Sequence, residues 1–258
     1  MGALEIALRA RREAGGSSFV PYLTGGFPGV DVPLLRAVAA AGVDAIEVGV
    51  PHSDPVMDGG VIQEASSSAL AAGARPVDVL ATIREADLPI PVAVMTYVNP
   101  VLRRGLETFL DEAAAAGVAG VIVPDLPVDE SGGLRKACAA RNIDVVLLAA
   151  PGASGARLGE IVARASGFVY CVATYGVTGA RQELGRTAQD LVAELRALTN
   201  LPLLVGVGIG TPEQAREASA FADGVIVGSA LMSRMVEGDV DGTIGLVESF
   251  RSALPTGR

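Results

Sequence analysis

The stretch AIEVGV at positions 45–50 decides the fold. It is apolar at nearly every position, which is typical of a strand buried on both faces of a parallel sheet. Seven other runs along the chain share this character, and together they predict eight buried strands. The predicted strands are residues 19–23, 45–50, 92–97, 120–123, 145–150, 168–173, 203–209 and 224–227.

Segments with helical periodicity separate these strands, for example residues 33–41, 106–116, 158–165 and 188–198. Residues that accept a left-handed backbone and therefore end helices come shortly before the next strand, at Gly42, Gly73, Gly117, Asn142 and Gly167. A helix start is predicted at Thr211, because Pro212 follows in the first turn and Gln214 stands three residues after the threonine.

Eight strands alternating with helices within 258 residues predict an α/β protein with a single (β/α)8 TIM barrel, residues 1–258, preceded by an extra N-terminal helix. A doubly wound open sheet is the main alternative. From strand start to strand start, the spacing is mostly 21 to 28 residues, but it rises to 47 after the second strand and to 35 after the sixth. Long loops are therefore predicted at 51–62 and 174–187, where a barrel builds its active site. Simple loop growth or an extra helix is the alternative there.

Composition excludes several classes of partner and location. The net charge is -9, and no basic run exceeds the short patch around Arg9, Arg11 and Arg12, so nucleic acid and acidic membrane surfaces are poor partners. The longest nonpolar stretch, residues 113–124, is too short to span a bilayer. Residues 1–13 do not form a signal peptide, and two cysteines make no disulfide framework, so a cytoplasmic location is expected.

The inventory of reactive side chains leaves carboxylates as the groups for proton transfer. The single lysine, Lys136, lies in a predicted outer helix, away from the catalytic face where a Schiff-base lysine would be needed. The single histidine, His52, cannot build a zinc site of several histidines, so no metal is expected. His52 itself is expected to pack in a loop or lie at the surface.

Glu47 stands inside the apolar strand at 45–50. Burial disfavours the charged carboxylate and should raise its pKa, which suits a general acid/base near neutral pH. Side-chain alternation puts Glu47 on the opposite face from Ile46 and Val48, pointing into the barrel. The alternative is a structural carboxyl paired with an arginine.

Asp54 and Asp58 follow in the predicted loop at 51–62, and either could reach over a substrate. Each could equally be a turn or cap residue, so the residues alone do not choose between them. Glycine-rich motifs at 176–179, 206–210 and 228–229 follow the sixth, seventh and eighth strands. Backbone amides at such strand ends bind phosphate in many barrels, although ordinary turn chemistry is the alternative.

The motifs now in place resemble those of the tryptophan synthase alpha subunit family. They run in family order over essentially the whole chain. They are FVPYLTGG at 19–26, IEVGVPHSDP at 46–55, DG at 58–59, MTYVNP at 95–100, PDLP at 124–127 and GVTG at 176–179. The resemblance implies a lyase of tryptophan biosynthesis that cleaves indole-3-glycerol phosphate into indole and glyceraldehyde 3-phosphate, without metal or Schiff base.

The resemblance also assigns roles. Glu47 matches the family's general acid/base, and Asp58, rather than Asp54, matches the carboxylate that binds the indole N–H. The matched substrate-binding positions are Tyr22, Ile62, Met95, Ile122, Tyr170, Thr178, Gly179, Gly208, Gly228 and Ser229. No cofactor is implied on this chain. The implied partner is a pyridoxal-phosphate beta subunit in an α2β2 complex, which would receive indole near residues 51–54 and 99–104.

Departures from the family pattern concern the loops rather than the catalytic pair. His52 replaces a usual Phe or Tyr, Gly60 replaces a usual Pro, Tyr22 replaces a common Phe, and residues 173–175 differ from a common Ser-Arg-type sequence. Alternative functions are a stand-alone lyase that releases free indole, a non-catalytic regulatory paralogue, and another phosphate-binding barrel such as a sugar-phosphate isomerase.

Overall fold

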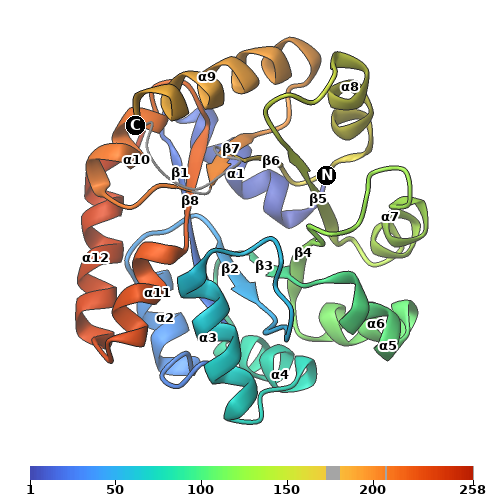
Figure 1. Cartoon of the computed structure of the whole chain (residues 1–258), viewed down its shortest axis with the longest axis vertical. Coiled ribbons are helices and arrows are strands. Elements are labelled where there is room, and N and C mark those ends of the chain that lie inside the picture. Colours follow the sequence, from blue (N-terminus) through green and yellow to red (C-terminus); the bar gives the residue numbers. More distant parts are fainter. Residues whose placement is uncertain (173–180, 207, 258) are drawn as a thin grey trace.

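The protein forms a closed parallel barrel in which strands β1 to β8 neighbour one another in sequence order (Figure 1). The computed structural model describes residues 1–172, 181–206 and 208–257. For residues 181–186 it describes the backbone only. This topology confirms the predicted TIM barrel and rules out the open sheet. The strands are β1 (Ser18–Thr24), β2 (Ile46–Gly49), β3 (Val92–Met95), β4 (Val118–Ile122), β5 (Asp144–Ala149), β6 (Val169–Val172), β7 (Leu203–Gly206) and β8 (Gly224–Val227).

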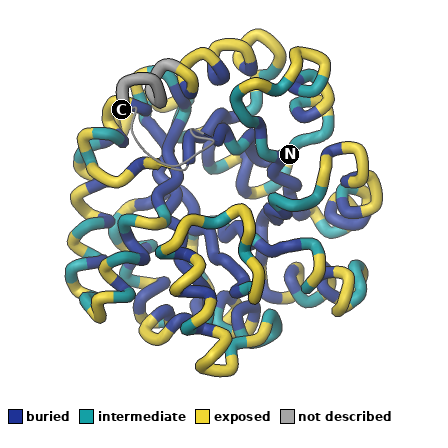
Figure 2. The backbone as a smooth tube through the Cα atoms, viewed as in Figure 1, coloured by how far each residue is buried: buried dark blue, intermediate teal, exposed yellow. Residues whose placement is uncertain are grey.

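Helices surround the barrel, and their outer faces carry most of the exposed residues (Figure 2). The helices are α1 (Ala3–Glu13), α2 (Val32–Ala40), α3 (Gly60–Ala71), α4 (Pro76–Ala86), α5 (Val98–Arg104), α6 (Leu106–Ala115), α7 (Gly132–Ala139), α8 (Gly155–Arg164), α9 (Arg181–Leu198), α10 (Pro212–Ala218), α11 (Ser229–Val236) and α12 (Val240–Ala253). Of the helices described, none combines the length and the apolar character needed to cross a membrane.

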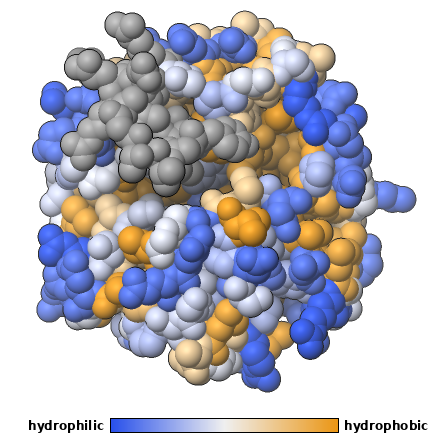
Figure 3. All heavy atoms as spheres, viewed as in Figure 1, coloured by the Kyte–Doolittle hydropathy of each residue, from blue (hydrophilic) through white to orange (hydrophobic). Residues whose placement is uncertain are grey.

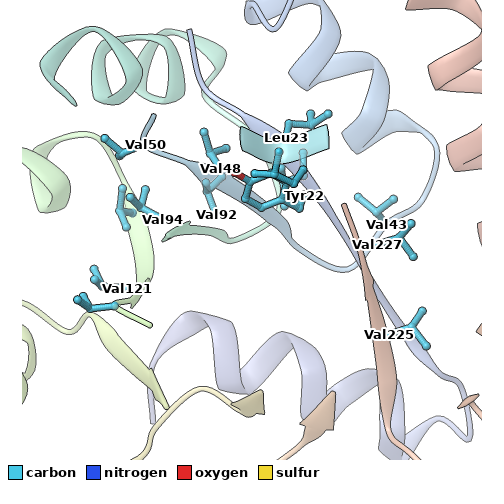
Figure 4. Packing of buried hydrophobic residues seen from close by; sticks show 14 of the residues in the cluster. Tyr22, Leu23, Val43, Val48, Val50, Val92, Val94, Val121, Val225 and Val227 are labelled. Carbon is cyan, nitrogen blue, oxygen red and sulfur yellow. The ribbon is translucent and has the colours of Figure 1, made fainter. Parts of the chain in front are cut away.

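The core has two parts, separated by the strands. Outward-facing strand side chains such as Leu23, Val48 and Val94 pack against the surrounding helices (Figure 4). Inward-facing side chains fill the barrel itself, and Leu4 and Leu8 of α1 join them. Helix α1 contacts β1, β4 and β5, so it closes the end of the barrel at which the strands begin. The predicted N-terminal helix is therefore confirmed, and it plugs one end of the barrel.

A buried ion pair ties this closed end together. Asp44, just before β2, accepts hydrogen bonds from Arg11 Nε at 2.6 Å, Arg251 at 3.1 Å and the backbone N–H of Phe19 at 2.9 Å. Arg251 also donates to the carbonyl of Ser17 at 3.1 Å. One carboxylate thus joins α1, β1 and α12, which are distant in the sequence.

The local signals in the sequence correspond to observed backbone features. The five predicted helix-stop residues all have positive φ: 81° at Gly42, 87° at Gly73, 78° at Gly117, 57° at Asn142 and 77° at Gly167. Thr211 caps α10, and Gln214 completes a capping box by bonding back to the backbone of Thr211. Both kinds of prediction are confirmed because each depends only on neighbouring residues.

Several predicted boundaries are wrong. The seventh strand ends at Gly206 rather than at residue 209. The third strand ends at Met95 rather than at residue 97, because Tyr97 already caps α5. The long interval after β2 holds an additional helix, α3, which begins at Gly60, so the loop proper spans residues 50–59. In the second long interval, residues 181–187 belong to α9 rather than to a loop. In each case, an apolar or glycine-rich run gave the position of the element but not its end.

Candidate active site

A cavity of about 500 Å³ opens at the end of the barrel opposite α1, where the strands finish. Its volume lies within the range of sites that hold small organic ligands. Side chains from β1, β2, β3, β4, β5, β6 and β8 line it, with segments that follow β2, β7 and β8. Figure 3 shows hydrophobic side chains gathered around a hollow on the face turned to the viewer. The cavity is therefore a mostly apolar chamber built from almost every strand.

Glu47 lies on the floor of this cavity. In the strand register, Glu47 lies opposite Tyr22 of β1 and Ala93 of β3, and only 1% of Glu47 is exposed to solvent. Within the part of the chain that the structure describes, its Oε2 atom has no hydrogen-bond partner. Burial, together with the nearby Asp58 carboxylate, raises the pKa of Glu47 to about 8. Near neutral pH, Glu47 is therefore a neutral carboxylic acid with a proton to donate.

Asp58 reaches the same cavity from the loop after β2. Its Oδ2 accepts a hydrogen bond from the Tyr97 hydroxyl at 2.9 Å, and the same Tyr97 oxygen accepts the backbone N–H of Met57 at 3.0 Å. Burial raises the pKa of Asp58, while the hydrogen bond from Tyr97 and the nearby His52 act to lower it. Asp54, the other loop carboxylate, is exposed and is not among the described residues that line the cavity.

Between the two carboxylates, the wall is apolar and aromatic. Tyr22, Met95, Ile122 and Tyr170 project inward from four strands, and Ile62 joins them from α3. A side chain at Gly49 would collide with the Tyr22 hydroxyl, and one at Gly206 would collide with the Tyr170 hydroxyl. Two glycines on β2 and β7 thus make room for two phenols, and the chamber fits a flat ring.

The far side of the cavity is polar and is built from backbone. Gly208, with φ of 91°, follows β7, while Gly228 caps α11 and Ser229 begins it. All three line the cavity together with Ala230. The first amides of a helix have no acceptor within that helix, and the helix dipole favours negative charge there. This side of the cavity suits an anionic group such as phosphate.

Comparison with known proteins identifies one family over nearly the whole chain. The family model described as Tryptophan synthase alpha chain matches residues 8–251. The chain is 48% identical over 240 residues to the tryptophan synthase alpha chain of Streptomyces avermitilis, covering 92% of this chain and 87% of the relative. It is 43% identical over 261 residues to that of Synechocystis sp., covering 99% of both. The chain belongs to the tryptophan synthase alpha chain family.

The structural comparison agrees with this membership. A structure of Mycobacterium tuberculosis tryptophan synthase superimposes with a TM-score of 0.90 at 36% identity, covering 99% of both chains. The family resemblance carried by the motifs is thus confirmed. Of the site residues expected for a tryptophan synthase alpha chain, Glu47, Asp58, Tyr22, Ile62, Met95, Ile122, Tyr170, Gly208, Gly228 and Ser229 line one cavity. Thr178, Gly179 and the departure at 173–175 lie outside the described residues.

Several residues of this tryptophan synthase alpha chain site were not predicted from the sequence: Leu148, Ile226 and Ser233 also line the cavity, and Tyr97 holds Asp58. Tyr97 was assigned to the third strand, but it is buried at the start of α5 and bonds Asp58. Its place in the MTYVNP motif just after a barrel strand was the available signal, since polar residues at strand ends build barrel sites. His52, expected to pack in a loop, stacks on Tyr97 with ring centroids 4.7 Å apart and planes at 18°.

Proposed function

We propose that this chain catalyses the alpha reaction of tryptophan synthase, the cleavage of indole-3-glycerol phosphate into indole and glyceraldehyde 3-phosphate. The observation that carries the proposal is Glu47, which is buried, has no hydrogen-bond partner for Oε2 among the described residues, and lies near a second carboxylate in an apolar chamber. Such an acid has little structural use, because a buried polar group without a partner lowers stability. Its position is explained by a substrate that receives the proton.

In the proposed reaction, Glu47 donates its proton to the indole ring carbon that carries the side chain. The ring becomes a cationic tautomer, and the Asp58 carboxylate stabilises it by accepting a hydrogen bond from the indole N–H. Loss of the proton from the adjacent side-chain hydroxyl, assisted by Glu47, forms the aldehyde. The carbon–carbon bond breaks, and its electron pair returns to the ring, so one proton is added and one is removed. No further reactant is required.

The cavity suits the two ends of this substrate. The indole ring would lie among Tyr22, Met95, Ile122 and Tyr170, and the phosphate would lie against the amides at Gly228 and Ser229. Burial raises the pKa of both Tyr22 and Tyr170, so these phenols stay neutral and add no charge against the indole ring. Gly208 is assigned to the phosphate side. Gly179 belongs to the same phosphate assignment, and Thr178 is the loop threonine expected to close over the substrate.

The proposed partner is a tryptophan synthase beta subunit in an α2β2 complex, with pyridoxal phosphate on that partner and none on this chain. Exposed apolar side chains at the cavity end of the barrel, Val56 and Met57 in the loop after β2 and Leu102 on α5, favour a protein contact there. Leu102 lies in the region 99–104 that the family resemblance places near the partner, and Val56 and Met57 follow shortly after the other such region, 51–54. We further assign the chain to the cytoplasm as one barrel domain spanning residues 1–258.

A steady-state assay of indole release tests the proposal. The purified chain is given indole-3-glycerol phosphate, first alone and then with a candidate beta subunit. We expect slow release alone and faster release with beta. Rapid release that beta does not change would support a stand-alone lyase, and no release under either condition would exclude the proposed reaction.

The role of Asp58 is tested by Asp58→Asn. The amide keeps the shape of the side chain but loses the charge that stabilises the cationic ring, so kcat should fall about 100-fold. Inhibition of the reaction by inorganic phosphate should stay unchanged, because the helix start at Ser229 is untouched. A variant that changed only the phosphate affinity would show that Asp58 has been assigned to the wrong end of the substrate.

A further inference from the structure

Residues 54–58, the part of the loop that carries Asp58, are joined to Tyr97 by two hydrogen bonds that share one oxygen atom. Backbone hydrogen bonds within this loop are local, from Val56 N–H to Asp54 at 3.0 Å and from Asp58 N–H to Pro55 at 3.0 Å. One hydrogen bond links the loop to α3, from Gln63 Nε2 to the carbonyl of Asp58 at 2.8 Å, and two others meet at the Tyr97 hydroxyl, which accepts from Met57 N–H and donates to the Asp58 carboxylate. The position of the Asp58 carboxylate therefore depends on where the Tyr97 phenol points.

Tyr97 is fixed at its backbone. It caps α5, and the next amide, that of Val98, donates to the Asp125 carboxylate at 2.9 Å, which joins this point to the segment after β4. The phenol extends from that anchor toward the loop, and a small rotation of the ring would displace its oxygen from both bonds. His52 contacts this ring, with centroids 4.7 Å apart and planes at 18°. An offset or tilted stack of this kind restrains ring orientation.

We infer that His52 is a positioning residue for Asp58: its ring, stacked on Tyr97, orients the phenol that holds the Asp58 carboxylate at the cavity. The kinetic consequence of this arrangement rests on the proposed function, while its structural consequence does not. Histidine suits the position because His52 is only half-buried, and a polar ring can pack its face against the phenol without losing all contact with solvent. Without the stack, the Asp58 carboxylate would spend less time at its position in the cavity.

Kinetics on the purified chain separate this role from a merely structural one. His52→Ala removes the stack, and kcat should fall about fivefold with KM within about twofold, as expected for losing one aromatic pair. His52→Phe keeps a ring of similar shape and should restore kcat to within about twofold of the original. Ser53→Ala, at the exposed neighbouring position, is the matched control and should behave as the original chain. A Phe variant as slow as the Ala variant would overturn the inference.

A double-mutant cycle shows whether His52 acts through the phenol oxygen. Tyr97→Phe keeps the ring for stacking but removes the hydroxyl that reaches Asp58. On that background, His52→Ala should cause no further loss of kcat, because the group it positions is already gone. Losses that simply multiply would show that His52 affects the reaction by another route, and would also overturn the inference.

Hydrogen exchange of the Met57 amide gives a readout that needs no activity. Its acceptor is the Tyr97 oxygen, so exchange should be several-fold faster in His52→Ala and in Tyr97→Phe, and unchanged in His52→Phe and Ser53→Ala. Equal exchange in His52→Ala and the original chain would overturn the inference. If the original chain releases no indole, the proposed function fails, and the exchange experiment still decides whether His52 orients Tyr97.

Discussion

Two buried carboxylates, Asp44 and Glu47, lie three positions apart in the sequence but belong to opposite ends of the barrel. At the closed end, Asp44 accepts hydrogen bonds from Arg11, Arg251 and the amide of Phe19. At the open end, Glu47 has an oxygen for which the described residues offer no partner. Burial is nearly complete for both, so burial alone does not distinguish a structural carboxylate from a catalytic one.

The difference lies in what surrounds each carboxylate. Asp44 is enclosed by donors from three segments, which compensate for the water it has lost and tie those segments together. Glu47 is surrounded by apolar walls and a second carboxylate, which favour its neutral form. At the closed end, the protein's own donors satisfy the Asp44 carboxylate. At the open end, the Glu47 carboxylic acid keeps a proton that it can donate to a ligand. Four experiments test whether the two carboxylates differ in this way.

The largest effect is expected for Glu47→Gln on the reaction. Glutamine fills the same space but supplies no acidic proton, so kcat for indole release should fall by about 10²- to 10⁴-fold. The steady-state assay measures this, and an unchanged circular dichroism spectrum would show that the barrel is intact. A residual rate within tenfold of the original would mean that Glu47 is not the acid.

The same variant should reveal the opposite effect on stability. The folded-state pKa of Glu47 is about 8 and its ordinary value is 4.5, so the folded chain binds more protons between these pH values, and its stability falls as pH rises through them. Each pKa unit corresponds to about 1.4 kcal/mol. Glu47→Gln, which has no such titration, should match the original chain at pH 5 and exceed it by about 4 kcal/mol at pH 9. Urea unfolding at both pH values measures the difference, and equal stabilities at pH 9 would contradict it.

At the closed end, Asp44→Ala should destabilise the fold by about 3 kcal/mol, since it leaves the buried Arg251 guanidinium without its counter-charge. The matched control is Asp111→Ala, whose side chain is 69% exposed and pairs with Arg141 at the surface. That loss should stay below about 1 kcal/mol. Urea unfolding compares the two variants, and similar losses in both would show that enclosure of Asp44 contributes nothing.

The smallest effect is expected at the mouth of the open end, for Gly60→Pro. Gly60 is the first residue of α3, and no atom lies within 4 Å of where its Cβ would stand. The preceding Gly59 has φ of -74° and ψ of 165°, which a following proline accepts. The variant should be more stable by about 0.5 to 1 kcal/mol through a less flexible unfolded chain. A lower melting temperature would show strain at this helix start.

The fold could be predicted from the sequence more completely than the site. The buried strand runs and the residues that end helices predicted the barrel correctly, because both depend on local pattern. Glu47 could be assigned an inward direction from alternation alone, and Ile46 and Val48 indeed pack on the outer face. The choice of Asp58 over Asp54 needed the family resemblance, because it depends on the path of a loop and on Tyr97, which caps α5 after another strand. Contacts of that kind are set by tertiary structure and leave no mark on neighbouring residues.

The closure of the barrel between its first and last strands has a consequence for how the chain folds. Ser18 pairs with Gly224, and Arg251 of α12 reaches Asp44 beside the second strand. Contacts so distant in the sequence form slowly, since a long loop must be ordered before any of them contributes. During synthesis, β1 must wait for β8 to leave the ribosome, with its edge unpaired until nearly the whole chain has emerged. In the cell, this waiting period is the stage at which the nascent barrel is most exposed to aggregation and most dependent on chaperones.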